Sequence, residues 1–130
     1  MHVAAHDQGY VEAAATSVYG ALADAPGYPR WWRDARWDGR LALRLGGRAA
    51  FHARAERHRP DVGLVLALGG PRTGSLEWHL EPLEDGTIVN AILNLHLTGG
   101  RRRSERGLMR ARIRIHRGLV GLKHALEATP

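Results

Sequence analysis

The chain has 130 residues, a net charge of +6 and 44% hydrophobic residues, and it contains no cysteine. This length suits one domain, and the hydrophobic content argues against wholesale disorder. The lack of cysteine excludes disulfides, thiolate metal sites and a cysteine nucleophile, and it agrees with a cytoplasmic location. No apolar run approaches the roughly 18 residues of a membrane helix, so we expect no membrane span.

The positive charge is concentrated near the end of the chain. The segment 101–117 holds eight arginines, and Lys123 is the only lysine. A basic surface favours anionic partners. Two interpretations stay open, a solvated helix face and a docking surface for an acidic partner. Nucleic acid is not the expected partner, because no aromatic side chains accompany the arginines.

The N-terminal third predicts a weak strand and two short helices. Residues 2–11 alternate poorly, so they give only a weak strand signal. Helical spacing of apolar residues follows from Glu12 to Ala23, and an Asp-Ala-Pro-Gly sequence ends it. A second short helix is predicted from Tyr28 to Arg33, carrying Trp31 and Trp32.

Five segments then alternate between apolar and polar residues with a period of two, which is typical of strands with one dry face. They cover residues 41–45, 51–56, 62–68, 76–81 and 87–98. Turns rich in glycine, proline and aspartate are expected between them, at Gly69-Gly70-Pro71 and at Asp85-Gly86. At Asp85-Gly86 we expect the glycine to take a positive φ. The pattern predicts an antiparallel meander.

The last segment, Ser104 to Ala128, predicts one long amphipathic helix. Its apolar stripe consists of Leu108, Ile115, Leu119, Leu122 and Leu126, and it is widened by Met109, Ile113, His116 and Val120. Arginines follow the opposite side, at Arg103, Arg106, Arg110, Arg114 and Arg117. Because a sheet with one dry face must be covered on that side, we expect this helix to cover it.

Three segments of the chain resemble the polyketide cyclase/dehydrase group of the START-like (SRPBCC) superfamily. The segment SVYGALADAPGYPRWWRDA (17–35) resembles the first two helices of that group. The segment 56–89 resembles its proline-led strand, glycine-rich turn, tryptophan strand and Gly-Thr-x-Val strand start, and 116–128 resembles its closing helix. The resemblance implies one START-like domain over residues 1–130. It also implies an α+β helix-grip fold, in which a curved antiparallel sheet wraps around a long C-terminal helix, with two short helices near the N-terminus.

The resemblance further implies a cavity between the sheet and the C-terminal helix, which binds a hydrophobic or aromatic small molecule. Small side chains among large ones on the dry face, such as Ala53 and Ala91, would leave space for it, although the same residues also suit an ordinary core. Trp78 is the strongest candidate for ligand contact. The predicted ligand-binding residues are Trp31, Leu43, Phe51, Leu66, Trp78, Ala91, Leu93, Leu95 and Leu119.

Two functions stay open. A polyketide cyclase or aromatase would use His116 to move protons, Arg112 to hold an enolate or carboxylate, and the phenol of Tyr28, in a cyclisation or dehydration. Its substrate could ride on an acidic acyl carrier protein docked on the arginines. The alternative is a non-catalytic carrier or sensor for a lipid, quinone or sterol-like molecule. We expect neither a cofactor nor a metal, and a homodimer stays open.

Overall fold

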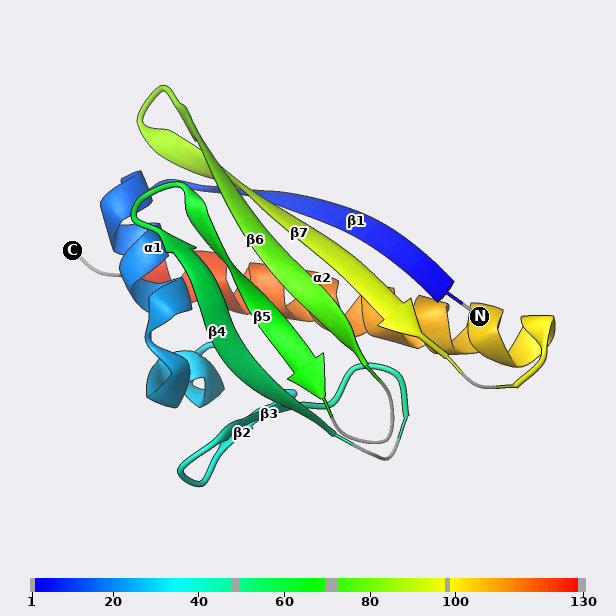
Figure 1. The fold of residues 1–130 in the computed structure, drawn as a ribbon. Coiled ribbons are helices and arrows are strands. Elements are labelled where there is room, and N and C mark those ends of the chain that lie inside the picture. The colour runs from blue at the N-terminus through cyan, green and yellow to red at the C-terminus, as the bar shows by residue number, and fades with distance from the viewer. Residues whose placement is uncertain (1, 48–49, 70–72, 98, 129–130) are drawn as a thin grey trace.

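The computed structural model describes residues 2–47, 50–69, 73–97 and 99–128. The elements follow in the order β1 (His2–Val11), α1 (Ala15–Ala23), the 3-10 helix η1 (Ala25–Arg30), β2 (Ala35–Trp37), β3 (Leu41–Leu43), β4 (Phe51–Arg59), β5 (Gly63–Gly69), β6 (Gly74–Leu83), β7 (Gly86–His96) and α2 (Arg101–Glu127). The strands form one antiparallel sheet, and the long helix α2 runs along one side of it (Figure 1). This arrangement confirms the expected helix-grip fold.

The sheet has the strand order β1-β7-β6-β5-β4-β3-β2. Strands β3 to β7 therefore form the predicted meander, because each pairs with the next one along the chain. Strand β1 joins the far edge by pairing with β7 over its whole length, from His2 opposite His96 to Val11 opposite Thr87. This pairing makes a regular strand of a segment whose own alternation is poor. Strand β2 was not predicted, because three residues are too few to show a period.

The alternation along the predicted strands gives the inner face correctly. On β6, Leu76, Trp78 and Leu80 are buried, whereas the residues between them are less so. Val62 is the exception, because it precedes β5 and is 40% exposed. Gly70, Pro71 and Thr98, which belong to predicted turns and strand ends, lie outside the described residues.

The turn between β6 and β7 differs from the expectation. Glu84 takes the positive φ, at 54°, and Gly86 already pairs with Leu83 as the first residue of β7. Glycine is needed at 86 for another reason: a Cβ there would lie 2.5 Å from the ring of Tyr10 and from the carbonyl oxygen of Val11. The glycine therefore allows β1 to approach closely.

The short helices lie at one end of the sheet, near the C-terminal end of α2 (Figure 1). The second one is a 3-10 helix that ends at Arg30, so Trp31 and Trp32 follow it rather than belong to it. Glu127 ties this end together, since its carboxylate accepts hydrogen bonds from the backbone N–H of Glu12 at 2.8 Å and from Nζ of Lys123 at 2.7 Å. Within the described part of the chain, no helix is long and apolar enough to cross a bilayer.

Helix α2 buries a side that is rich in small residues. The buried positions are Ser104, Gly107, Ala111, Ile115, Gly118, Leu119 and Leu122. The expectation that Met109, Ile113 and Val120 widen the buried stripe is wrong, since they are 65%, 56% and 38% exposed. Small residues let α2 approach its neighbours closely: Gly9 of β1 lies near Leu119, and the Trp32 ring lies directly over Gly118.

Candidate functional site

Four aromatic side chains form the centre of the core. Tyr28, Trp31 and Trp32 come from η1 and the turn after it, and Trp78 comes from the inner face of β6. The rings of Trp31 and Trp32 are stacked at 5.7 Å, and Trp78 meets both edge-on at 6.3 and 6.0 Å. These spacings are those of favourable aromatic pairs. The predicted ligand contact Trp78 is therefore surrounded by protein rings on this side, and none of it is exposed.

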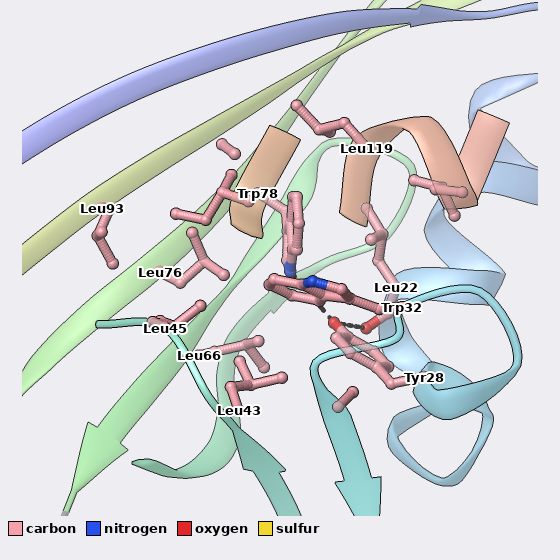
Figure 2. Packing of buried hydrophobic residues seen from close by; sticks show 14 of the residues in the cluster. Leu22, Tyr28, Trp32, Leu43, Leu45, Leu66, Leu76, Trp78, Leu93 and Leu119 are labelled. Atoms are coloured by element: carbon pink, nitrogen blue, oxygen red, sulfur yellow. Dashed lines mark hydrogen bonds between the residues drawn. The ribbon is translucent and has the colours of Figure 1, made fainter. Parts of the chain in front are cut away.

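Hydrogen bonds fix the rings of Tyr28, Trp32 and Trp78 in place, whereas the buried Nε1 of Trp31 has no hydrogen-bond partner among the described residues. Trp78 Nε1 donates to Tyr28 Oη at 3.1 Å, and Tyr28 Oη donates to the carbonyl oxygen of Leu22 at 2.6 Å (Figure 2). Trp32 Nε1 donates to the carbonyl oxygen of Arg114 at 3.0 Å. Burial raises the pKa of Tyr28 well above its ordinary value, although the hydrogen bond from Trp78 opposes the shift. The phenol is thus held neutral, with both of its hydrogen-bonding roles used inside the protein.

The predicted ligand-binding residues meet in one cluster. The cluster contains all of Trp31, Leu43, Phe51, Leu66, Trp78, Ala91, Leu93, Leu95 and Leu119, each at most 9% exposed. Figure 2 shows Leu43, Leu66, Leu76 and Leu93 along the sheet, with Leu119 of α2 near Trp78. The seven that lie on strands form the inner face of the sheet as expected, whereas Trp31 follows η1 and Leu119 belongs to α2. Whether a ligand touches them stays a prediction, because the contacts described are those of a packed core.

The positions of two predicted catalytic residues differ from the expectation. His116 lies on the flank of α2 beside β1 with a side chain that is 65% exposed, and its Nδ1 lies 3.1 Å from Oδ2 of Asp7. Arg112 is also exposed. Both residues lie exposed on a flank of α2 rather than among the buried positions that face the sheet, so neither reaches the interior. Of the three predicted catalytic residues, only Tyr28 lies inside, and no polar cluster brings them together.

A hollow of about 620 Å³ lies at the edge of the sheet, between the hairpin of β2 and β3 and Ala25 of η1. We call it the Trp37 hollow. Leu41, Ala53, Ala55 and Leu68 share the inner face in register, and Trp37 and Ala25 add apolar surface beside them. Arg40, His52 and Arg54 supply its charged and titratable lining. No residue of α2 is among the lining residues described, so this hollow is not the expected space between sheet and helix.

Sequence reasoning found part of this lining and missed the rest. Ala53 was expected to leave space because it is a small residue between large ones. The pairing of Trp37 with Leu41 was missed, because strand β2, which carries Trp37, has only three residues and shows no period of its own. The Asp38-Gly39 sequence after Trp37 was the available signal for a hairpin.

The described residues include no group of three or more histidine, aspartate or glutamate side chains that could hold a metal ion. A different concentration of charge is present. Five arginines border a second hollow around Asp34, on the opposite face of the β2–β3 hairpin.

Comparisons with known proteins identify the fold. The chain is similar to a START superfamily protein from Mycobacterium smegmatis, with 16% identity over 100% of both chains and a TM-score of 0.77. It is also similar to the Aha1 dimer from Colwellia psychrerythraea, with 18% identity over 96% of both chains and a TM-score of 0.70. CalU16 from Micromonospora echinospora is 18% identical over 98% of this chain and 76% of its own, with a TM-score of 0.65.

At these identities the likeness shows the fold and not the activity. No protein-family model matches the sequence, and no curated protein matches it. The chain therefore has a START-like helix-grip fold, as the sequence resemblance implied.

Proposed function

We propose that this chain binds an apolar or aromatic small molecule in the Trp37 hollow, as a carrier or sensor. The observation that carries the proposal is the hollow itself, about 620 Å³ of space beside an otherwise closely packed core. Small-molecule sites commonly measure about 300–1,000 Å³ and combine apolar walls with a few polar groups. The START-like fold supports the same proposal, because the resemblance of the sequence to that superfamily implies ligand binding.

The lining indicates what kind of molecule fits. Trp37 is 41% exposed, whereas each of the other three tryptophans is at most 9% exposed, so its ring is the one available for stacking. Ala53 and Ala55 leave room opposite it. Arg40 can pair with a carboxylate, phenolate or enolate. We infer a flat aromatic or polyketone-like ligand with one polar end.

The experiment uses N-phenyl-1-naphthylamine, an uncharged dye that fluoresces in apolar surroundings. We expect Ala55→Phe to fill the hollow and to weaken dye binding at least tenfold. Ala4→Phe is the matched control, because Ala4 is an exposed strand residue away from the hollow, and it should leave binding within twofold. Trp37→Leu removes the stacking ring and should weaken binding several-fold, since ring stacking contributes about 1 kcal/mol.

Equal binding by wild type and Ala55→Phe, with both folded to the same extent by circular dichroism, would refute the Trp37 hollow as the site. Binding that falls equally in Ala4→Phe would point to a general surface effect and would refute it as well.

Polyketide cyclisation or dehydration is the second candidate, and the position of His52 favours it. His52 borders the hollow, where it could transfer a proton to or from a bound polyketone. Native mass spectrometry of freshly purified protein separates the two candidates. A co-purifying lipid or quinone supports a carrier. An empty protein that cyclises a polyketone mimic, and loses this turnover but not dye binding in His52→Gln, supports the enzyme.

Several earlier expectations remain parts of this proposal. The coverage of 96–100% of this chain in the first two comparisons supports a single START-like domain over 1–130. Ligand contact by the buried predicted residues, an acidic carrier protein on the arginines of α2, and a homodimer stay predictions.

A further inference from the structure

We propose that a second hollow binds a phosphorylated small molecule through its phosphate or diphosphate group. We call it the arginine hollow. It has a volume of about 630 Å³, and its charged lining is Arg33, Asp34, Arg36, Arg44, Arg114 and Arg117. These residues come from the turn after η1, from β2, from the segment after β3 and from α2. Four separate parts of the chain thus bring guanidinium groups to one place.

The local charge is strongly positive. Five arginines and one aspartate give a net charge of +4 around the hollow. Asp34 is the organising residue, since its carboxylate is only 9% exposed and lies 3.4 Å from Arg117 Nη1 and 4.0 Å from Arg114 Nε. Arg114 also donates from Nη1 to the carbonyl oxygen of Gly47 at 3.4 Å. Two of the arginines are therefore held in position by acceptors of the protein.

The other three arginines are not neutralised in this way. Among the described residues, Arg33, Arg36 and Arg44 form no ion pair with a carboxylate. All three are exposed, and a smaller hollow of about 50 Å³ that Arg33, Arg36 and Arg44 also border continues the basic surface. Like charges that converge without a counter-charge leave a strongly positive potential, which attracts anions.

The backbone explains why the arginines converge. Asp34 and Arg36 alternate with Ala35 and Trp37, so they point to the face of the hairpin opposite the Trp37 hollow. The backbone N–H of Arg44 donates to the carbonyl oxygen of Asp34 at 3.0 Å, which places Arg44 directly beside Asp34. On α2, Arg114 and Arg117 are three residues apart and therefore lie on the same side of the helix.

The chemistry of the lining selects phosphate. Guanidinium is planar and always charged, and it offers paired N–H donors that match the oxygens of phosphate. Lysine, which would act as a point charge, is absent from the lining described. A net charge of +4 exceeds what one carboxylate neutralises, whereas a diphosphate carries several negative charges. The volume also exceeds that of a lone anion, leaving space for the organic part of the ligand.

Calorimetric titration with sodium pyrophosphate at low ionic strength tests the proposal with the whole chain. Each charge-assisted hydrogen bond contributes enough for about a tenfold change in affinity, so Arg36→Gln and Arg44→Gln should each weaken binding about tenfold. Both side chains are exposed, and thermal unfolding should confirm that the variants fold. Arg102→Gln at the start of α2 and Arg59→Gln at the end of β4 are matched controls with the same loss of charge, because both residues are exposed and neither borders the hollow, and they should change binding less than twofold.

A second arm identifies the source of the phosphate group. Co-sedimentation with phosphatidylcholine vesicles containing phosphatidic acid, lost in Arg36→Gln, assigns the hollow to a lipid headgroup. Pyrophosphate binding without vesicle binding assigns it to a soluble phosphorylated molecule. Both results support the site.

Three results would overturn it. The first is no heat from pyrophosphate at low salt, and the second is equal weakening by the control variants, which would mean diffuse attraction. The third is binding of an oligonucleotide without binding of pyrophosphate, which would mean a polyelectrolyte surface. None of these results bears on dye binding in the Trp37 hollow, because that dye has no charge.

Discussion

Tyr28→Phe tests the interpretation that this phenol is part of the packing of the core. The substitution removes one oxygen and leaves the indole N–H of Trp78 without its acceptor and the carbonyl oxygen of Leu22 without its donor. Both partners are at most 1% exposed, so water does not replace the lost bonds. An unsatisfied buried polar group costs about 1–3 kcal/mol, and we therefore expect a loss of about 3 kcal/mol in the free energy of unfolding.

This loss in the free energy of unfolding corresponds to a lower melting temperature. Unfolding entropy is about 2.1 cal/mol/K per residue, or about 0.27 kcal/mol/K for a chain of 130 residues, so the midpoint should fall by about 11 °C. Urea unfolding followed by tryptophan fluorescence measures the free energy. Tyr19→Phe is the control with the same chemical change, because its hydroxyl meets His58 Nδ1 at 3.2 Å on the surface, and it should cost about 0.5 kcal/mol or less. Equal losses in the two variants would refute the reasoning.

Three further predictions concern pH and packing. Because burial raises the pKa of Tyr28 above its ordinary 10.0, the unfolded chain releases the phenolic proton first. The contribution of Tyr28 to the free energy of unfolding is therefore fully present below pH 10, and it falls above pH 10 by up to about 1.4 kcal/mol per pH unit. Urea unfolding between pH 9 and pH 11 should therefore show a smaller fall in stability for Tyr28→Phe than for the wild type. The pKa of Glu127 is lowered by hydrogen bonds from the backbone N–H of Glu12 and from the ammonium of Lys123. Its contribution to stability is therefore present above pH 4.5 and is lost as the pH falls through the pKa of the folded state. Glu127→Gln should reduce the difference between the urea midpoints at pH 7 and pH 3. In Gly118→Ala the new Cβ would lie 2.7 Å from the Trp32 ring and should cost about 1–3 kcal/mol, whereas Gly20→Ala, with nothing within 4 Å, should stabilise by about 0.5–1 kcal/mol in the same unfolding assay.

The meander could be predicted because its evidence is local. Each strand of the segment 41–97 carries its own alternation, and the inner face follows from it without knowledge of the partner strand. Strand β1 is different, since its regularity comes from pairing with β7, more than 70 residues away. The weak local pattern in residues 2–11 was therefore a correct description of the sequence and an incomplete description of the fold.

The faces of α2 show where hydrophobicity misleads. Met109 and Ile113 are apolar but exposed, whereas Gly107, Ala111 and Gly118 are buried. These three small residues, together with Ser104, Ile115 and Leu122, recur at intervals of three and four, which marks a helix side as surely as large residues do. Close approach selects small side chains, because the Trp32 ring occupies the space that a Cβ at residue 118 would need. A pattern weighted by hydrophobicity gives such residues too little weight, and this is why His116 and Arg112 were expected to reach the interior.

The candidate sites depend on the β2–β3 hairpin, whose two faces have opposite chemistry. Trp37 and Leu41 lie across from each other in register and face the apolar hollow. Arg36, at the next position of the same strand, borders the arginine hollow, and Arg44 follows on the same face. Because side chains alternate along a strand, neighbouring residues of one short strand lie on opposite faces, one apolar and one strongly positive, with only the backbone between them. A shift of one residue in the pairing would exchange the two faces and bury guanidinium groups against the core. Such a shift would cost far more free energy than one in a strand whose two faces are both exposed to solvent. The carbonyl oxygen of Asp34, which accepts the N–H of Arg44 just beyond the last paired residues, opposes such a shift and so preserves both sites at once.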